Sequence, residues 1–198
     1  TRVRSSAASD VYKRQERPLI FSNNDRPGII LSSSIKKYID YYGVKTGENI
    51  SLFTNNDSAY ETAISLNKSG VKVKVIIDIR ENPKSPLSEK IEKAGIKILR
   101  GYTITNTDGY KRIKSIDVMK LSKDGENVVG NKTTYKCDCL GISGGWTPMV
   151  HLFTQSGGKL KFRNNDNVFI PDENKTPSEQ ISVGSVSYTH LRAHETDS

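Results

Sequence analysis

The amino-acid sequence predicts an α/β fold: a parallel βαβαβ unit followed by a three-stranded antiparallel meander. Between residues 50 and 99, apolar strand segments alternate with helical segments, which favours parallel strands joined by helices. Beyond residue 101 the apolar residues recur with a period of two, and Gly-containing turns separate the runs. Charged residues are 26% and hydrophobic ones 34%, which is typical of globular domains and excludes a collagen-like or membrane class.

The first elements are a loop at 16–28 and a helix at 32–42, in which Ile35, Tyr38, Ile39 and Tyr42 recur at i, i+3, i+4 and i+7. Gly43 suits the position that ends this helix. The remaining elements of the parallel unit are expected as strands at 50–54, 72–78 and 96–99 and helices at 58–69 and 87–94.

The meander is expected from three runs with period two, at 102–106, 112–121 and 133–137. Polar turns with glycine separate them at 107–109 and 123–126, as antiparallel hairpins require. One further apolar strand at 138–143 then opens into Gly144 and Gly145.

The two ends, residues 1–15 and 186–198, are expected to be non-native tails that make no regular tertiary contacts. They lack apolar periodicity, and their composition differs from the Lys-, Asn- and Ile-rich middle. Both resemble translated sequencing-adapter DNA at the ends of environmental reading frames, so the chain looks like a bacterial metagenome fragment. The alternative is a pair of genuine disordered tails. His190 and His194 lie in the second tail, so no metal site is expected.

Charge and cysteine usage exclude several classes of partner. The net charge is +8, but the lysines are scattered among apolar and acidic residues, so no nucleic-acid partner is expected. No apolar run approaches the roughly 18–20 residues that span a bilayer, and no secretory signal is present, which favours a cytoplasmic location without a membrane partner. Cys137 and Cys139 are spaced neither for redox chemistry nor for zinc, and are expected as small buried strand residues.

The loop after the first βαβ strand is a candidate pyrophosphate site. A dinucleotide fingerprint places a tight turn, usually G-x-G-x-x-G/A, at the start of a helix. Here the register reads TNNDSA, so only Ala59 conforms, although Asn56 could make the turn in a left-handed backbone conformation. Asp57 is unfavourable beside a phosphate. The alternative is an ordinary βα loop. The candidate cofactor-binding residues here are Thr54, Asn55, Asn56, Ser58 and Ala59.

Four more residues are candidates for chemistry: Asp78, Gly144, Gly145 and His151. Asp78 follows the turn at the spacing of an acid that bonds the adenosine ribose, which favours NAD over NADP, although Arg80 weakens this interpretation and a solvent-facing strand end is the alternative. Gly144 and Gly145 indicate a close backbone approach, either to a cofactor or within a mere turn. His151 has no identifiable partner, so no catalytic residue is predicted.

Taken together, five segments resemble the alpha subunit of heterotetrameric sarcosine oxidase. They are 16–21 (ERPLIF), 24–28 (NDRPG), 53–60 (FTNNDSAY), 143–153 (SGGWTPMVHLF) and 155–160 (QSGGKL). The resemblance covers about residues 16–185 and includes the unusual Asn-containing phosphate loop.

The resemblance implies a fragment of a two-dinucleotide-binding flavoprotein fold with a nested, Rossmann-like NAD-binding domain. Residues 16–43 would connect from the outer dinucleotide domain, 44–142 would form the nested NAD-binding domain, and 143–185 would return to the truncated outer FAD-type domain. A ferredoxin-like N-terminal region and a C-terminal folate-binding domain would lie outside this fragment.

The resemblance also implies an activity for the whole complex, in which this subunit binds NAD and joins beta, gamma and delta subunits. The beta subunit holds the flavins, FAD and FMN, and oxidises sarcosine with oxygen. The methyl carbon passes to tetrahydrofolate, with glycine and hydrogen peroxide as further products. Alternatives are a related opine or amine oxidase subunit, a hydrogen cyanide synthase, or a non-catalytic NAD-binding structural module. The fragment alone is expected to be inactive.

Overall fold

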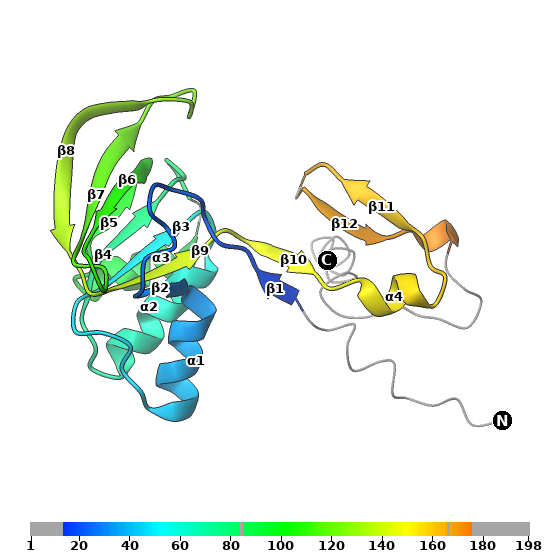
Figure 1. Ribbon diagram of the computed structural model, residues 1–198, viewed down its shortest axis with the longest axis horizontal. Helices are drawn as coiled ribbons and strands as arrows, with labels where there is room; N and C mark the ends of the chain where they lie inside the picture. Colours follow the sequence, from blue (N-terminus) through cyan, green and yellow to red (C-terminus); the bar gives the residue numbers. More distant parts are fainter. Residues whose placement is uncertain (1–13, 84, 166, 176–198) are drawn as a thin grey trace. The chain divides into compact units, whose positions relative to one another are not determined.

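The computed structural model describes residues 14–83, 85–165 and 167–175. They fall into two compact units (Figure 1): a larger one spanning residues 16–145, and a smaller one that holds Arg14, Gln15 and the described residues from Trp146 onward. The expectations for residues 1–13 and 186–198, including His190 and His194, lie outside the described residues.

A five-stranded parallel sheet forms the middle layer of the larger unit. In spatial order its strands are β2 (Ile29–Leu31), β9 (Cys139–Ser143), β3 (Ile50–Thr54), β4 (Val73–Asp78) and β5 (Ile98–Arg100). Each neighbouring pair is parallel. The predicted parallel arrangement of the strands near 50–54, 72–78 and 96–99 is therefore confirmed.

Helices cover one face of this sheet (Figure 1): α1 (Ser32–Tyr42), α2 (Ser58–Lys68) and α3 (Pro86–Lys93). Helix α1 ends at Gly43, which has the left-handed φ of 62° expected there. The core of this face joins Ile35 of α1, Ala63 and Leu66 of α2 and Ile91 of α3 to Ile50, Leu52 and Ile76 of the sheet. The alternating pleat sends every second strand residue to this layer.

The antiparallel meander covers the opposite face (Figure 1). It consists of β6 (Tyr102–Asp108), β7 (Ser115–Leu121) and β8 (Val128–Lys136), each antiparallel to the next. Its buried side chains pack on those strand residues that point away from the helices; this second core contains Phe53, Val75, Ile77, Ile104, Ile116, Val118, Leu140 and Ile142. The predicted change from a parallel unit to a meander is thus confirmed.

Strand β2 and the first half of β8 were not predicted. Strand β2 has only three residues behind a turn-rich loop, too few to show a period, and residues 128–132 of β8 are exposed, so no apolar alternation marks them. Because β2 and α1 belong to the parallel sheet layers, the compact unit begins at Glu16, whereas we expected the nested domain to begin at residue 44.

The expectation that residues 1–15 make no regular contacts is wrong for its last two residues. Arg14 and Gln15 open strand β1 (Arg14–Glu16), which pairs with β10 (Trp146–Pro148), and the Arg14 guanidinium lies 4.3 Å from the centre of the Trp146 ring. Backbone N–H and C=O groups can pair in a strand without any apolar period, so the hydrophobic pattern did not predict strand β1.

The smaller unit also holds helix α4 (His151–Gln155), the antiparallel pair β11 (Leu160–Arg163) and β12 (Val168–Pro171), and the 3₁₀ turn η2 (Glu173–Lys175). Val168 and Ile170 of β12 pack with Val150, while Phe162 and Phe169 face each other across the strand pair with ring centres 5.1 Å apart. No helix among the described residues is long and apolar enough to cross a membrane.

Candidate functional site

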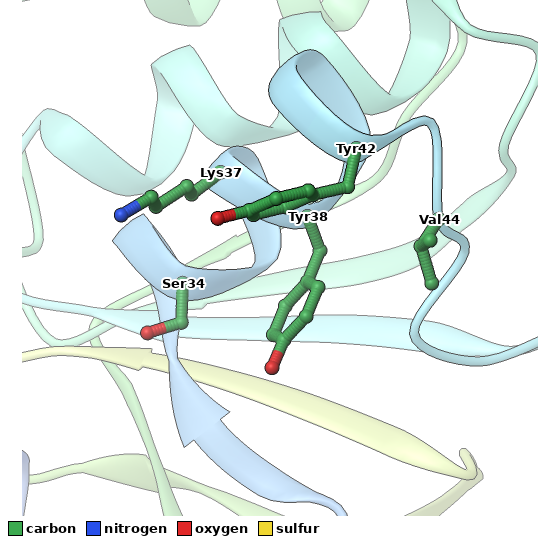
Figure 2. Close-up of a pocket in the computed structure, with 5 residues that line it drawn as sticks. All are labelled: Ser34, Lys37, Tyr38, Tyr42 and Val44. Carbon is green, nitrogen blue, oxygen red and sulfur yellow. The ribbon is translucent and has the colours of Figure 1, made fainter.

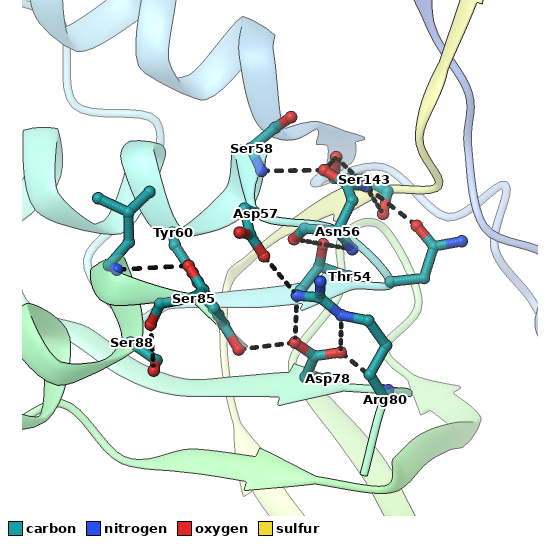
Figure 3. A network of polar contacts seen from close by, with 12 residues as sticks. Thr54, Asn56, Asp57, Ser58, Tyr60, Asp78, Arg80, Ser85, Ser88 and Ser143 are labelled. Carbon is teal, nitrogen blue, oxygen red and sulfur yellow. Dashed lines mark hydrogen bonds and ion pairs between the residues drawn. The ribbon is translucent and has the colours of Figure 1, made fainter. Parts of the chain in front are cut away.

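Three adjacent strands end in buried polar residues at one edge of the parallel sheet (Figure 3). Thr54, the last residue of β3, is in register with Asp78 at the end of β4 and with Ser143 at the end of β9. All three are fully buried. Ligands of open α/β sheets bind at the carboxyl ends of the strands, so this edge is the candidate site.

Asn56 shapes the turn that follows β3. Its Nδ2 donates to the carbonyl and the hydroxyl of Ser143 at 3.0 and 3.1 Å, and its Oδ1 accepts from the Ser58 N–H at 2.9 Å. The Thr54 hydroxyl accepts from the Asn56 N–H at 3.0 Å. Asn56 is not among the residues with positive φ, so it makes the turn through its side chain and not through the left-handed backbone that we expected.

Helix α2 begins directly after this turn and contributes backbone donors. The N–H groups of Asp57 and Ala59 make no hydrogen bond within the part of the chain that the structure describes. Ala59 is fully buried, so the helix packs closely against the sheet, whereas Asn55 is exposed and its N–H donates to the Ser143 carbonyl at 3.2 Å. Free N–H groups at a helix N-terminus favour an anion such as a pyrophosphate.

Asp78 is closed to solvent and held by four donors (Figure 3). Its Oδ1 accepts from the N–H and the Nε of Arg80 at 2.9 and 3.1 Å. Its Oδ2 accepts from the Tyr60 hydroxyl at 2.6 Å and from Arg80 Nη2 at 2.8 Å. A carboxylate offers about four lone-pair positions, so a direct bond to a ribose, as expected from the sequence, would require one of these donors to leave. Nor is Asp78 a solvent-facing strand end.

Arg80 joins Asp78 to Asp57 of the turn, because its Nη2 also donates to Asp57 Oδ1 at 2.8 Å. Burial acts to lower the pKa of Arg80, but the hydrogen bonds to Asp78 and Asp57 outweigh it, so the pKa is raised on balance. Burial, together with the bond to Asp78, raises the pKa of Tyr60, and its phenol stays protonated. Asp57, which is unfavourable beside a phosphate, is therefore paired with the guanidinium of Arg80.

Gly144 and Gly145 make a close approach to the protein's own backbone. The Gly144 N–H donates to the Arg17 carbonyl at 2.7 Å, and the Arg17 N–H donates to the Gly145 carbonyl at 2.8 Å. A Cβ at position 144 would stand 2.7 Å from the carbonyl oxygen of Pro18, and Gly145 has a φ of 95°. The close approach of the segment around Arg17 and the positive φ of Gly145 therefore explain why both positions are glycine.

Groups for acid, base or redox chemistry are scarce near this edge. Cys137 and Cys139 are buried free thiols, and burial raises the pKa of Cys137 to about 12 and that of Cys139 in the same direction. His151 is exposed on α4 in the smaller unit. Within the described ranges no three His, Cys, Asp or Glu residues are grouped to hold a metal ion.

A hollow of about 460 Å³ lies on α1 and the residues that follow it (Figure 2). Figure 2 shows its lining residues, Ser34, Lys37, Tyr38, Tyr42 and Val44. The side chains offer hydroxyls and one ammonium group but no carboxylate, thiol or imidazole. It is a partly exposed aromatic surface and not a candidate catalytic site.

Sequence reasoning missed Tyr60 and Ser143 as parts of the site and treated Asp57 and Arg80 only as obstacles. The sequence does contain a signal for Arg80. Asp78 ends the apolar run 75–77, so it is expected to be buried and to need a cationic partner, and Arg80 is two residues away. No spacing rule connects Tyr60 on a helix or Ser143 on a distant strand to Asp78.

The fold and this edge define the larger unit as a Rossmann-like domain of the kind found in FAD- and NAD(P)-binding oxidoreductases. Similar solved structures include the thioredoxin reductase of T. acidophilum, with a TM-score of 0.59 and 16% identity, covering 89% of this chain and 59% of that chain. The bacillithiol disulfide reductase of Staphylococcus aureus gives a TM-score of 0.56 and 16% identity, covering 86% of this chain and 52% of that chain. At such identity the likeness shows the fold alone.

The chain is a relative of the sarcosine oxidase alpha subunits, and the resemblance predicted from its sequence is confirmed. It is 35% identical over 159 residues to the subunit of Corynebacterium sp. strain P-1, and 33% identical over 145 residues to that of Rhizobium meliloti strain 1021. These matches cover 79% and 73% of this chain but only 16% and 13% of the relatives. No protein-family model matches the chain.

Proposed function

We propose that this chain is the NAD-binding part of an alpha subunit in a sarcosine oxidase-type enzyme. The observation that carries the proposal is the turn after β3, which Asn56 ties to Ser143 and in which the N–H group of Asp57 has no hydrogen-bond partner among the described residues. The sequence similarity to sarcosine oxidase alpha subunits supports the choice among nucleotide-binding proteins.

In this proposal the pyrophosphate accepts from the N–H group of Asp57, with Asn55 and Ser58 beside it, while the buried Ala59 packs α2 against the sheet. Thr54 and Asn56 hold the turn. Asp78 is a positioning residue, because its oxygens are taken up by Tyr60 and Arg80, and the adenosine ribose meets Arg80, whose side chain is 32% exposed. NAD bound there would be a hydride acceptor.

Gly144 and Gly145 have an indirect part in the proposal: they let the segment around Arg17 close one side of the edge.

The reaction of the whole enzyme extends the proposal beyond this chain, which spans 16% of the length of a Corynebacterium relative. We propose a cytoplasmic complex with beta, gamma and delta subunits that contains FAD and FMN and oxidises sarcosine to glycine. The one-carbon unit would pass to tetrahydrofolate, and hydrogen peroxide would form. This fragment would not turn over sarcosine by itself.

A second candidate is a structural role in which bound NAD never reacts. The network at the edge favours it: Tyr60 is held protonated, Asp78 is fully bonded, and both cysteines are buried with raised pKa values. Transfer of hydride to the bound NAD⁺, followed by NADH absorbance in the complete enzyme, separates the two roles. Appearance of NADH with sarcosine contradicts the structural role.

Calorimetry with NAD⁺ on the 198-residue chain tests the binding proposal. Asn56→Ala removes the bonds to Ser143 and Ser58, and with about 1 kcal/mol for each lost bond the affinity should fall about tenfold or more. The matched control is Asn131→Ala, on the exposed strand β8, which should bind like the parent. Absence of binding to the parent at millimolar NAD⁺, or equal affinity in Asn56→Ala, contradicts the proposal.

A further inference from the structure

We infer that Asp57 sets the nucleotide specificity of this edge by occupying the Arg80 donors that would otherwise hold a 2′-phosphate. The inference rests on the proposed function, since it concerns which dinucleotide the site accepts. It assigns a role to the one residue of the turn that seemed to oppose phosphate binding, and it follows from how the hydrogen bonds of Arg80 are distributed (Figure 3).

Arg80 has few donors left for a ligand. A guanidinium has five N–H groups, arranged as one fork on its Nε–Nη2 side and another on its Nη1–Nη2 end. Asp78 takes the first fork, through Nε at 3.1 Å and Nη2 at 2.8 Å. Asp57 takes the remaining Nη2 hydrogen at 2.8 Å and so blocks half of the second fork. Only Nη1 makes no hydrogen bond within the described part of the chain.

One free nitrogen suits a hydroxyl better than a phosphate. An Arg–phosphate contact gains strength and specificity from two parallel N–H donors, and this pair is incomplete here. A ribose hydroxyl needs a single donor, which Nη1 offers. The side chain of Arg80 is 32% exposed.

The charge of the cluster acts in the same direction. Asp57, Arg80 and Asp78 together carry two carboxylates and one guanidinium, so their formal charge is negative. A 2′-phosphate would bring further negative charge against it, whereas free ribose hydroxyls bring none. Geometry and charge therefore both favour the nucleotide that lacks the 2′-phosphate.

Asp57, and not Asp78, is the residue that can be changed to alter this preference. Asp78 is fully buried under four donors, so its removal would leave Tyr60 and Arg80 without their partner in the interior. The Asp57 side chain is 42% exposed and its carboxylate has one ion pair, with Arg80. Releasing Asp57 opens the Nη1–Nη2 end of Arg80 and leaves the bond to Asp78 in place.

Calorimetric titration of the chain with NAD⁺ and with NADP⁺ tests the inference, and the readout is the ratio of the two dissociation constants. In Asp57→Asn the preference for NAD⁺ over NADP⁺ should fall about tenfold. Asp57→Ser, which keeps a good helix-capping residue, should shift the ratio in the same direction. Asp40→Asn removes an equal charge from the Lys36–Asp40 pair on α1 and should leave the ratio within about twofold of the parent.

The outcomes distinguish a failure of the role given to Asp57 from a failure of the proposed NAD binding. If the parent binds NAD⁺ and both Asp57 variants, folded by circular dichroism, keep the parental ratio, the role of Asp57 is refuted while the proposed function stands. A shift of the same size in Asp40→Asn also refutes it, because the effect would then be one of net charge. If the parent binds neither nucleotide, both the proposed function and the inference fail.

Discussion

Replacing Gly144 with alanine should destabilise the larger unit, because this glycine packs directly against the backbone of Arg17 and Pro18. A Cβ at this position would come within 2.7 Å of the Pro18 carbonyl oxygen and 2.8 Å of the Arg17 carbonyl oxygen. Both contacts are shorter than side-chain carbons tolerate, and neither neighbour is a flexible side chain that could turn away.

The expected loss follows from the bonds that must give way. Moving the two backbones apart weakens the bonds Gly144 N–H to Arg17 O, at 2.7 Å, and Arg17 N–H to Gly145 O, at 2.8 Å. At about 1 kcal/mol for each bond and about 1–3 kcal/mol for the crowding, less about 0.4–1 kcal/mol from the stiffer unfolded chain, the net loss is about 2–5 kcal/mol.

Urea unfolding followed by far-UV circular dichroism measures this loss. With a slope of about 1–3 kcal/mol per molar urea, the midpoint should fall by about 1 M or more. Gly70→Ala is the comparison, since Gly70 has a φ of 72° and open space around it, so only the backbone cost of about 1–2 kcal/mol should appear. If Gly144→Ala unfolds with the parent and loses only NAD affinity, the glycine serves a cofactor and our assignment is wrong.

Two further changes test the buried groups. Tyr60→Phe removes the donor at 2.6 Å from Asp78 and should cost about 1–3 kcal/mol in the same urea experiment; an unchanged midpoint would show that Arg80 alone satisfies the carboxylate. The pKa of Cys137 is raised from 9.0 to about 12, so the unfolded thiol ionises before the native one and stability should fall as the pH rises above about 9. Urea midpoints measured above pH 9 should decline less steeply with pH in Cys137→Ala than in the parent. Equal declines in the two proteins would contradict the raised pKa of Cys137.

The sequence was sufficient for the regular part of the fold. Strands β3, β4 and β5 and the meander apart from the first half of β8 were predictable because their apolar residues recur with a clear period. Helix α1 could be delimited from its spacing and from Gly43. Strand β2 was not, because Ile29–Leu31 is too short to show a period and its partner β9 lies far away in the sequence.

The candidate site was predictable as a location but not as a set of bonds. The spacing between the turn and Asp78 indicated that both lie at the carboxyl ends of neighbouring strands, and Thr54 and Asp78 are in register there. It could not show that Asp78 is taken up by Tyr60 and Arg80, because those contacts depend on how α2 lies over β4. For the same reason the sequence could not show that Gly144 lies against Arg17, which is more than a hundred positions away.

The position of β9 has a consequence for how the chain folds. This strand lies between β2 and β3, pairing Leu140 with Ile29 and Cys139 with Ile50, yet it is synthesised after both of them and after the whole meander. Until it arrives, β2 has no partner in the sheet and one edge of β3 stays open. Contacts between such distant segments form slowly, and unpaired strand edges promote aggregation in the meantime. Growing chains that end before Cys139 are therefore expected to expose these unpaired strand edges.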